Sequence, residues 1–329
     1  MNRSEKGNKT VMQEPDKTTI ELAGKRISGY LHRTPVLTCS ALNRMFGSEL
    51  FFKCENFQKA GAFKSRGATN AVFQLSDDEM VRGVATHSSG NHAAALALAA
   101  SRRGSRAYIV MPENSSRVKI DAVREYGGII TFCKPTLEAR EQTLKLLLQR
   151  TSASEIHPYN DYRIIAGQAT AAMEFLEDVP DLQMIIAPVG GGGLLSGTAL
   201  AAKYFGRNVK VIAAEPDGAD DAFRSFKSGS FIPSLNPKTM ADGLLTSLGS
   251  LTYPIIMKYV DEIVTVSEDG IKEAMKLIWE RMKIIVEPSS AVPLAAILEK
   301  KLDVSRKKTG IIISGGNIDL SALPFNQTL

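Results

Sequence analysis

The sequence has few cysteines and no long apolar run, and both shortages argue against whole classes of protein. Cys39, Cys54 and Cys133 are the three cysteines among 329 residues, an odd number without a Cys-x-x-Cys spacing. This argues against a disulfide framework or a zinc knuckle and is typical of a reducing compartment. No stretch reaches the roughly 18 apolar residues of a membrane-spanning helix, and the N-terminus lacks the apolar segment of a signal peptide. We therefore expect a cytoplasmic protein with no membrane partner.

An excess of charge of one sign is also absent. The chain carries 40 basic and 35 acidic residues, a net charge of +5, and they are mixed along its length. Without a basic block or an aromatic RNA-binding pattern, nucleic acid is not an expected partner. The 44% hydrophobic content is that of an ordinary globular protein of one or two domains. About the first 15 residues are polar and are expected to be disordered.

Short apolar, β-branched runs alternate with helix-like stretches along the chain. The regular alternation, with several continuously apolar strands, predicts an α/β fold with parallel sheets. The predicted strands are 50–54, 84–87, 107–111, 128–133, 184–189, 209–214, 262–266 and 309–314. The predicted helices are 67–75, 92–101, 117–126, 137–150, 167–177, 194–205, 271–282 and 290–300, after a first one beginning near Thr18.

Four consecutive glycines stand where one predicted strand ends and a helix begins near Leu194. They are Gly190, Gly191, Gly192 and Gly193. Such a turn can direct several N–H groups at one point, and the helix dipole adds to them, so the pattern predicts a cradle for a phosphate. The Walker A and Gly-x-Gly-x-x-Gly patterns both fail here. The alternative is a tight turn without a ligand, although four glycines carry a large backbone entropy for that role.

Two further strand ends carry polar turns. One contains Ser88, Ser89, Asn91 and His92, which could hold a carboxylate through hydroxyl and N–H groups, or could simply cap a helix. The other begins with Ser314 and continues Gly-Gly-Asn, and it too could be a plain turn. Because ligands bind beyond the carboxyl ends of strands in open α/β sheets, the three turns together indicate one site.

Lys64 lies at the start of a predicted helix, beside Phe63. A cation there faces the positive end of the helix dipole, which favours the neutral amine or imine that covalent amine catalysis requires. The alternative is a solvated lysine near Lys59 and Arg66.

Four motifs, in order, carry a resemblance to a known family: KCENFQKAGAFKSRGA, THSSGNHAAAL, PVGGGGLLSG and IISGGN. The chain resembles the pyridoxal-phosphate enzymes of fold type II, and among them serine racemase and the serine/threonine dehydratases, from about Thr18 to Leu320. The resemblance implies two open α/β domains with the cofactor between them. The smaller domain would be residues 82–157, and residues 1–81 and 158–329 would form the larger one.

The resemblance also implies roles for individual residues. Lys64 would form the Schiff base, Phe63 would pack on the pyridine ring, and the four glycines with Leu194 would bind the phosphate. Ser314 would meet the pyridine nitrogen and Asn91 the phenolic oxygen. The substrate would be surrounded by Ser88, Ser89, Asn91, His92 and Arg140.

A divalent-metal site is implied in the same way after a later strand. Its ligands would be Glu215, the carbonyl of Ala219, and Asp221, oxygen donors suited to Mg²⁺ or Ca²⁺. Acidic loop residues are otherwise often merely solvated.

The reaction that the resemblance implies begins with removal of the Cα proton of L-serine by Lys64, with L-threonine as a further candidate substrate. Elimination of the β-hydroxyl gives a 2-oxo acid and ammonia, and reprotonation by Ser89 from the opposite face gives the D-amino acid. A threo-3-hydroxyaspartate dehydratase, with Arg140 holding the second carboxylate, and a catalytically silent amino-acid-binding protein remain alternatives. Relatives are usually dimers, so a homodimer is expected.

Overall fold

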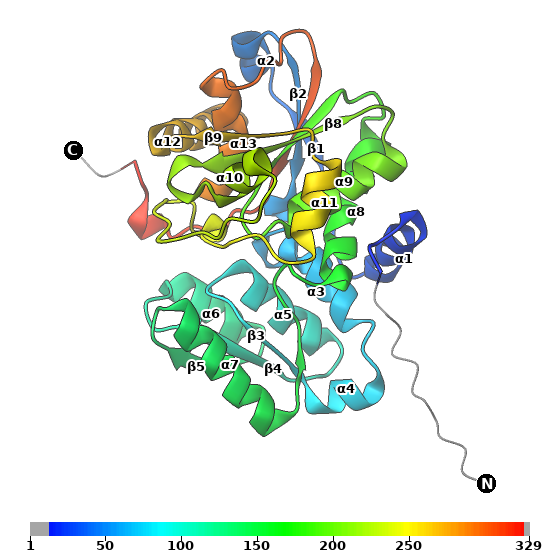
Figure 1. Ribbon diagram of the computed structural model, residues 1–329, viewed down its shortest axis with the longest axis vertical. Coiled ribbons are helices and arrows are strands. Elements are labelled where there is room, and N and C mark those ends of the chain that lie inside the picture. The colour runs from blue at the N-terminus through cyan, green and yellow to red at the C-terminus, as the bar shows by residue number, and fades with distance from the viewer. Residues whose placement is uncertain (1–12, 326–329) are drawn as a thin grey trace.

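Residues 13–325 are described by the computed structural model, and they form two sheets, each covered by helices (Figure 1). This confirms the predicted α/β class. The expectation of disorder at the N-terminus concerns a stretch of which residues 1–12 lie outside the described part.

The larger sheet has six strands in the order β1-β2-β10-β7-β8-β9. Neighbouring strands run parallel except β1, which pairs antiparallel with β2. The central strands are apolar and buried, as strands covered on both faces must be. Their bounds are β1 Val36–Thr38, β2 Glu49–Cys54, β7 Met184–Pro188, β8 Lys210–Pro216, β9 Glu262–Val266 and β10 Lys308–Ile313.

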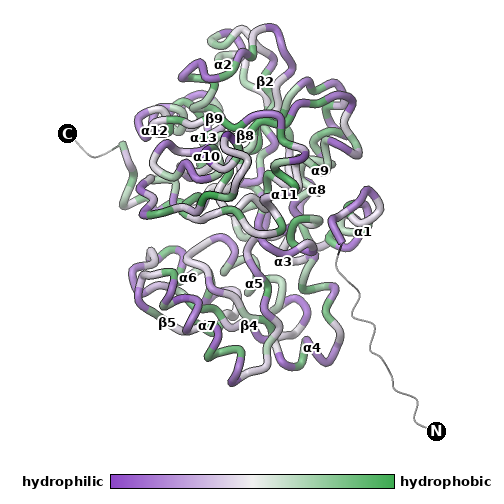
Figure 2. The backbone as a smooth tube through the Cα atoms, viewed as in Figure 1, coloured by the Kyte–Doolittle hydropathy of each residue, from purple (hydrophilic) through white to green (hydrophobic). Residues whose placement is uncertain are grey.

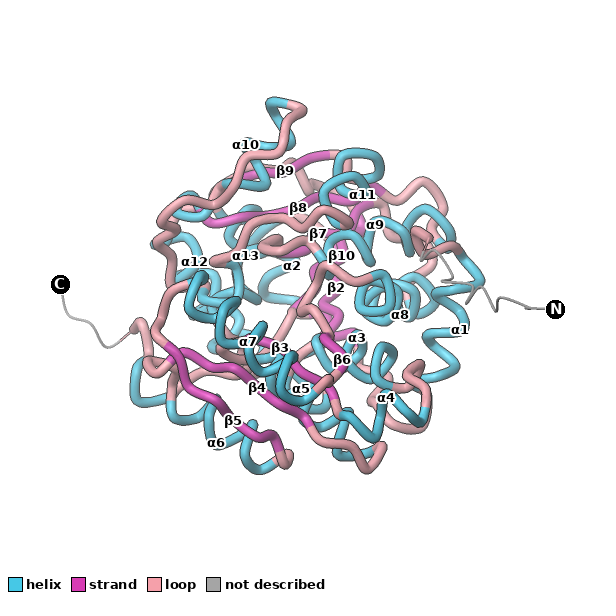
Figure 3. Tube along the Cα trace, turned by 60° about the horizontal axis from the view of Figure 1, so that its bottom comes forward, coloured by secondary structure: helices cyan, strands magenta, loops and turns pink. Residues whose placement is uncertain are grey.

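The smaller sheet has four parallel strands in the order β5-β4-β3-β6. All of its strands come from one continuous stretch of chain, and Figure 3 shows β3, β4 and β5 lying apart from the strands β8 and β9 of the larger sheet. The bounds are β3 Val84–His87, β4 Ala107–Pro112, β5 Gly128–Cys133 and β6 Ser154–Glu155.

Helices cover both faces of each sheet. On the larger sheet, α2, α12 and α13 share one core with the strands, and α8, α9 and α11 share the other. On the smaller sheet, α5 and α6 pack on one face and α7 on the other. Figure 2 shows green and purple alternating along α7, as expected for a helix with one buried side. The bounds are α1 Lys17–Ile27, α2 Ser40–Phe46, α3 Lys64–Val72, α4 Asp77–Arg82, α5 Asn91–Arg102, α6 Arg117–Glu125, α7 Leu137–Thr151, α8 Tyr162–Asp178, α9 Gly193–Phe205, α10 Asp221–Ser228, α11 Thr252–Tyr259, α12 Glu268–Leu277 and α13 Pro288–Leu298.

The predicted elements agree with the structure except at short or irregular segments and at some helix ends, such as α8, which begins at Tyr162 rather than at residue 167. The three-residue β1 and two-residue β6 were not predicted, because so few residues show no periodicity. The short helices α2, α4, α10 and α11 were also missed. Helix α3 begins at Lys64 rather than at Gly67, since Phe63 already has helical backbone angles. Lys64 is therefore the first residue of a buried helix.

Helix α8 crosses α3 and α9 at unusually close range. A Cβ on Gly167 would lie 2.6 Å from the carbonyl oxygen of Arg66, and one on Gly197 would lie 2.7 Å from the backbone nitrogen of Ala169. Glycine is therefore required at both crossings, and the three helices pack backbone to backbone. Within residues 13–325, no helix combines the length and the apolar character needed to cross a membrane.

Candidate active site

The segment before α3 lies against the end of β10. Phe63 donates its N–H to the carbonyl oxygen of Ser314 at 3.0 Å, and Gly316 donates to Gly61 at 2.9 Å. Ala62 forms an isolated antiparallel bridge with Gly315. These backbone bonds bring the lysine motif and the C-terminal glycine motif, about 250 residues apart in sequence, to one place.

Lys64 is a buried amine with one hydrogen bond in the described structure, from Nζ to the carbonyl oxygen of Pro158 at 2.8 Å. Its Nζ lies 5.2 Å from the centre of the Phe63 ring and 6.0 Å from that of Tyr159. Burial lowers the pKa of Lys64 to about 8, although the negative charge of Glu287 opposes the shift. The direction is the one expected from the sequence, but its main cause is desolvation rather than the helix dipole.

The glycine run forms the turn between β7 and α9. Gly192 has φ +85°, which disfavours any residue with a side chain, and a Cβ on Gly191 would lie 2.3 Å from the Tyr159 ring. Within the described residues, the N–H groups of Gly190, Gly191 and Gly192 form no hydrogen bond with the protein. Together with the start of the 13-residue α9, these free donors have the character that an anion such as phosphate requires.

Ser88 and Ser89 are half-buried in the turn between β3 and α5, where Gly90 donates its N–H to Ser88 Oγ at 3.3 Å. His92 is buried, and its Nε2 lies 3.0 Å from the carbonyl oxygen of Ile156. Burial lowers the pKa of His92 to about 3, so its ring is neutral at pH 7. The turn is therefore uncharged, and its polar groups act through hydrogen bonds.

Asn91 links the two sheets through a residue that sequence reasoning missed. Its Nδ2 donates to Glu287 Oε1 at 2.9 Å and Oε2 at 3.1 Å, and its Oδ1 accepts from Asn317 at 2.9 Å. Burial raises the pKa of Glu287 to about 7. Glu287 directly precedes α13, and an acidic residue there indicates only a helix start, so no sequence signal marked it.

Ser314 is buried with its hydroxyl oxygen 2.9 Å from that of Ser290, near the start of α13. Ser290 also donates to the carbonyl oxygen of Gly315 at 2.7 Å. The hydroxyl at the end of β10 thus has a neutral partner. Ser290 was not predicted as a site residue because a serine near a helix start usually serves as a cap.

Arg140 of α7 is partly buried, and its Nε has no hydrogen-bond partner in the described residues. Its charge acts with burial, which is the larger cause, to lower the pKa of His87 to about 4. The His157 ring lies 6.4 Å from that of His87 and 4.6 Å from that of Tyr159. These aromatic rings extend from Arg140 towards the glycine run.

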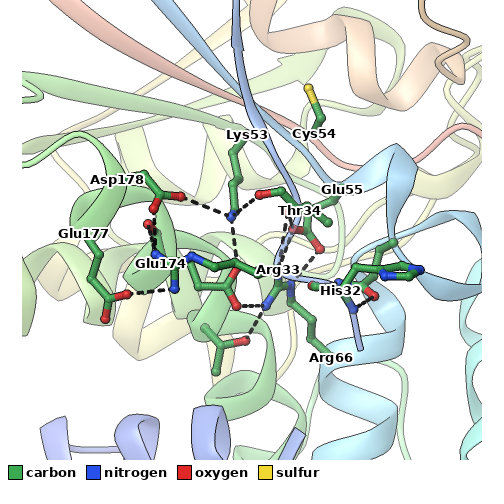
Figure 4. Close-up of polar contacts among 12 residues, drawn as sticks. His32, Arg33, Thr34, Lys53, Cys54, Glu55, Arg66, Glu174, Glu177 and Asp178 are labelled. Atoms are coloured by element: carbon green, nitrogen blue, oxygen red, sulfur yellow. Dashed lines mark hydrogen bonds and ion pairs between the residues drawn. The ribbon is translucent and has the colours of Figure 1, made fainter. Parts of the chain in front are cut away.

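A buried ion network anchors the helix that carries Lys64 (Figure 4). Arg66 donates from Nε to Glu55 at 2.7 Å and from Nη1 to Glu174 at 2.8 Å, and Lys53 donates to Glu174 at 2.9 Å. Arg66, Lys53 and Glu55 are fully buried. The two positive charges of this network balance its two negative charges. The four side chains join β2, α3 and α8. The sequence analysis did not predict these ion pairs, because a charged residue in a sequence carries no sign of which partner it will have.

The proposed metal ligands lie at the end of β8 and the start of α10. Glu215 accepts the N–H groups of Ala222 at 3.0 Å and Phe223 at 2.8 Å, while both carboxylate oxygens of the buried Asp221 lack a hydrogen-bond partner among the described residues. Burial raises the pKa of Glu215 to about 9 and that of Asp221 to about 6. Unpartnered oxygens on a buried carboxylate fit a divalent cation. In residues 13–325, no group of three or more acidic, histidine or cysteine side chains is placed to hold a metal ion, so a carbonyl such as that of Ala219 is needed as well.

Comparison with known proteins decides the family. The family model described as "Pyridoxal-phosphate dependent enzyme" matches residues 27–315. The chain belongs to this family. A curated serine racemase of Dictyostelium discoideum is 54% identical over 308 residues, covering 92% of this chain and 95% of the relative. A beta-hydroxyaspartate dehydratase of Paracoccus denitrificans is 51% identical over 304 residues, covering 92% and 96%.

A solved structure shows the same fold. The crystal structure of serine racemase from Dictyostelium discoideum has a TM-score of 0.87 and 54% identity, covering 92% of this chain and 98% of that one. Lys64 and the glycine run thus occur in a chain of the pyridoxal-phosphate family, as the sequence motifs indicated.

Proposed function

We propose that this chain removes the Cα proton of L-serine and then either eliminates the β-hydroxyl, giving pyruvate and ammonia, or returns the proton to the opposite face, giving D-serine. The observation that carries the proposal is the Lys64 amine, with its pKa lowered to about 8, which follows the Phe63 that bonds to Ser314 and lies 6.0 Å from the Tyr159 ring bordering the glycine run. Similarity to named serine racemases and to a hydroxyaspartate dehydratase supports it.

Pyridoxal phosphate, when bound, supplies an electron-accepting ring that stabilises the negative charge left on the substrate Cα. Lys64 is the base that takes the Cα proton, since a pKa near 8 is matched to that task at physiological pH. We assign Ser89 as the second acid, delivering a proton from the other face. The Ser88 hydroxyl and the backbone N–H groups of Asn91 and His92, at the start of α5, hold the substrate carboxylate without adding a charge.

Ser314 favours elimination. Its hydroxyl, 2.9 Å from that of Ser290, would give the ring nitrogen of the bound cofactor a neutral partner rather than a carboxylate. With such a partner the ring would take up less of the negative charge of the substrate Cα, and loss of the β-hydroxyl would be favoured over transamination. Ser314→Asp is expected to increase transamination relative to elimination, and unchanged partitioning would contradict this assignment.

The decisive experiment is product analysis with L-serine, quantifying pyruvate and D-serine together. The intact protein should form one or both products and show the visible absorbance of lysine-bound cofactor. Ser89→Ala should lose racemisation and retain elimination. The reverse outcome would contradict the role of Ser89, and a protein that stays colourless with added cofactor would indicate a silent binding protein instead.

A second candidate substrate is threo-3-hydroxyaspartate. The partly buried Arg140, whose Nε lacks a partner in the described residues, could hold a second carboxylate, and the named dehydratase relative supports the idea. Side-by-side kinetics with serine, threonine and hydroxyaspartate separate the candidates. Arg140→Lys should then reduce kcat/KM for hydroxyaspartate far more than for serine.

We also propose a Mg²⁺ or Ca²⁺ site formed by Glu215, the Ala219 carbonyl and Asp221. The unpartnered Asp221 oxygens and the raised carboxyl pKa values support it, because a cation would compensate the buried negative charge. Isothermal titration of the metal-free protein with each ion tests the site and identifies the preferred one.

Assembly and domain division are proposals of the same kind. We propose a cytoplasmic homodimer, tested by light scattering after size exclusion. The exposed side chains of Phe57 and Ile285 support dimerisation, because Asn56 bonds to the Ile285 carbonyl at 3.1 Å and so brings the two apolar residues into one region.

We propose residues 82–157 as a domain that closes on the remainder. The ion pair between Lys119 of α6 and Asp242, and the bonds of Asn91 to Glu287, support a contact between the two parts.

A further inference from the structure

Gln168 of α8 carries an amide whose hydrogen bonds are unaccounted for. The residue is fully buried, and neither Oε1 nor Nε2 has a hydrogen-bond partner among residues 13–325. A buried amide without partners is unfavourable, and folded proteins rarely retain one without a use. The surrounding helices are tightly packed, so the amide is held in place rather than free to reach solvent.

The amide end of Gln168 is directed at the glycine run. A Cβ built on Gly193, the first residue of α9, would lie 2.5 Å from Gln168 Oε1. A Cβ on Gly67 would lie 3.2 Å from Gln168 Cγ, so the side chain extends from α3 to the start of α9. A half-turn of the amide exchanges its oxygen and nitrogen, so Nε2 can occupy the same position.

Backbone donors without acceptors lie directly before Gly193 in the chain. The N–H groups of Gly190, Gly191 and Gly192 have no acceptor in the described residues, and the α9 dipole adds positive potential. All of these donors are backbone groups. An acceptor-rich anion placed there would satisfy them and would also provide the amide N–H of Gln168 with a partner.

We propose that Gln168 Nε2 donates a hydrogen bond to the phosphate of pyridoxal phosphate and is the side-chain member of an otherwise backbone cradle. The inference rests on the proposed function, because it requires that cofactor. It assigns Gln168 to cofactor binding. Gln168 precedes Thr170 and Glu174, two partners of Arg66, on α8, and its side chain borders Gly67 of the helix that begins with Lys64. The side chain is neutral, so it holds the phosphate without altering the charge beside the lysine.

The test compares Gln168→Met and Gln168→Glu with the parent protein after removal of cofactor. Titration with pyridoxal phosphate should show about tenfold weaker binding for Gln168→Met and a larger loss for Gln168→Glu, which sets an acceptor-only carboxylate against a dianion. Pyridoxal, which lacks the phosphate, should bind all three proteins equally. The melting temperature of cofactor-free Gln168→Met should be equal or higher, because the variant removes an unsatisfied amide.

Thr309→Val is the matched control. Thr309 is buried, its hydroxyl also lacks a partner in the described residues, and it lies at the opposite end of β10 from Ser314. This variant should change the affinity for neither ligand. Unchanged pyridoxal-phosphate affinity in Gln168→Met, or an equal loss for pyridoxal, would overturn the assignment of Gln168. Failure of the parent protein to bind pyridoxal phosphate would instead overturn the proposed function.

Discussion

Lys64 Nζ donates to the carbonyl oxygen of Pro158 at 2.8 Å, across 94 residues of sequence. The bond joins the first residue of α3 to the segment that leads into α8. Both helices are fixed by the Arg66 network, so donor and acceptor are anchored by the same ion pairs. The amine is therefore held in one place while burial keeps its pKa near 8.

Lys64→Met is expected to abolish catalysis and to stabilise the cofactor-free protein. Because the folded-state pKa is about 8 against an ordinary 10.5, the buried lysine destabilises the fold fully below pH 8, and the penalty vanishes above about pH 10.5. Its upper limit at pH 7 is about 3 kcal/mol. Urea unfolding should show that the difference in unfolding free energy between the two proteins is smaller at pH 10 than at pH 7. A gap that stays constant would contradict the pKa assignment.

Arg66→Met is expected to destabilise the protein by about 3–5 kcal/mol, because it leaves the carboxylates of Glu55 and Glu174 buried and short of a cation. Arg33 provides the control, since it pairs with Glu177 and Asp178 at the exposed end of the same cluster. Arg33→Ala should cost no more than about 1 kcal/mol. Denaturant unfolding measures both, and similar losses would show that burial does not set the strength of the network.

After divalent cations are removed, the unfolding free energy of the protein is expected to fall as pH rises. The folded-state pKa values of about 9 for Glu215 and about 6 for Asp221 exceed the ordinary 4.5 and 3.8. The folded state therefore keeps protons that the unfolded chain releases, and stability declines between about pH 4 and pH 9. Stabilisation by added Mg²⁺ should grow across the same range, since the ion replaces those protons. Thermal melts with chelator and with Mg²⁺ measure both trends.

Asp221→Asn should remove most of the Mg²⁺ effect. Asp220→Asn should preserve it, because Asp220 is partly exposed and pairs with Arg224 at 2.8 Å instead. Equal responses of the two variants would place the cation elsewhere.

Gly191→Ala is expected to weaken cofactor binding at least tenfold, because its methyl group would lie 2.3 Å from the Tyr159 ring and the cradle must shift. Tyr159→Ala in the same chain should restore part of the affinity by opening that space. Gly190→Ala should not be rescued, since its methyl group would meet the backbone of Leu244 at 2.8 Å. Fluorescence titration with pyridoxal phosphate distinguishes the four proteins, and rescue of both alanine variants would argue against a local clash.

The sequence predicted site residues best where their chemical type and their position at the end of a strand pointed to the same role. The glycine run, the turn with Ser88 and Ser314 each follow the end of a predicted strand, so the geometry of parallel sheets predicted one shared site for them, whereas Lys64 was assigned to it by the family resemblance. Glu287, Pro158 and Gln168 were missed because each acquires its role from a partner distant in sequence. A glutamate before a proline, or a glutamine inside a helix, looks the same whether its neighbours are water or a cofactor site.

The place of β10 in the larger sheet bears on how the chain is made. This strand lies between β2 and β7, yet it is the last strand to leave the ribosome. The smaller sheet, formed entirely by residues 84–155, can assemble earlier. Until residues 308–313 are synthesised, β2 and β7 each present an unpaired strand edge, a hazard for association with other chains. Ser314 and Phe63 cannot meet before then, so a nascent chain has no complete cofactor site, and truncation near the C-terminus would remove folding and catalysis together.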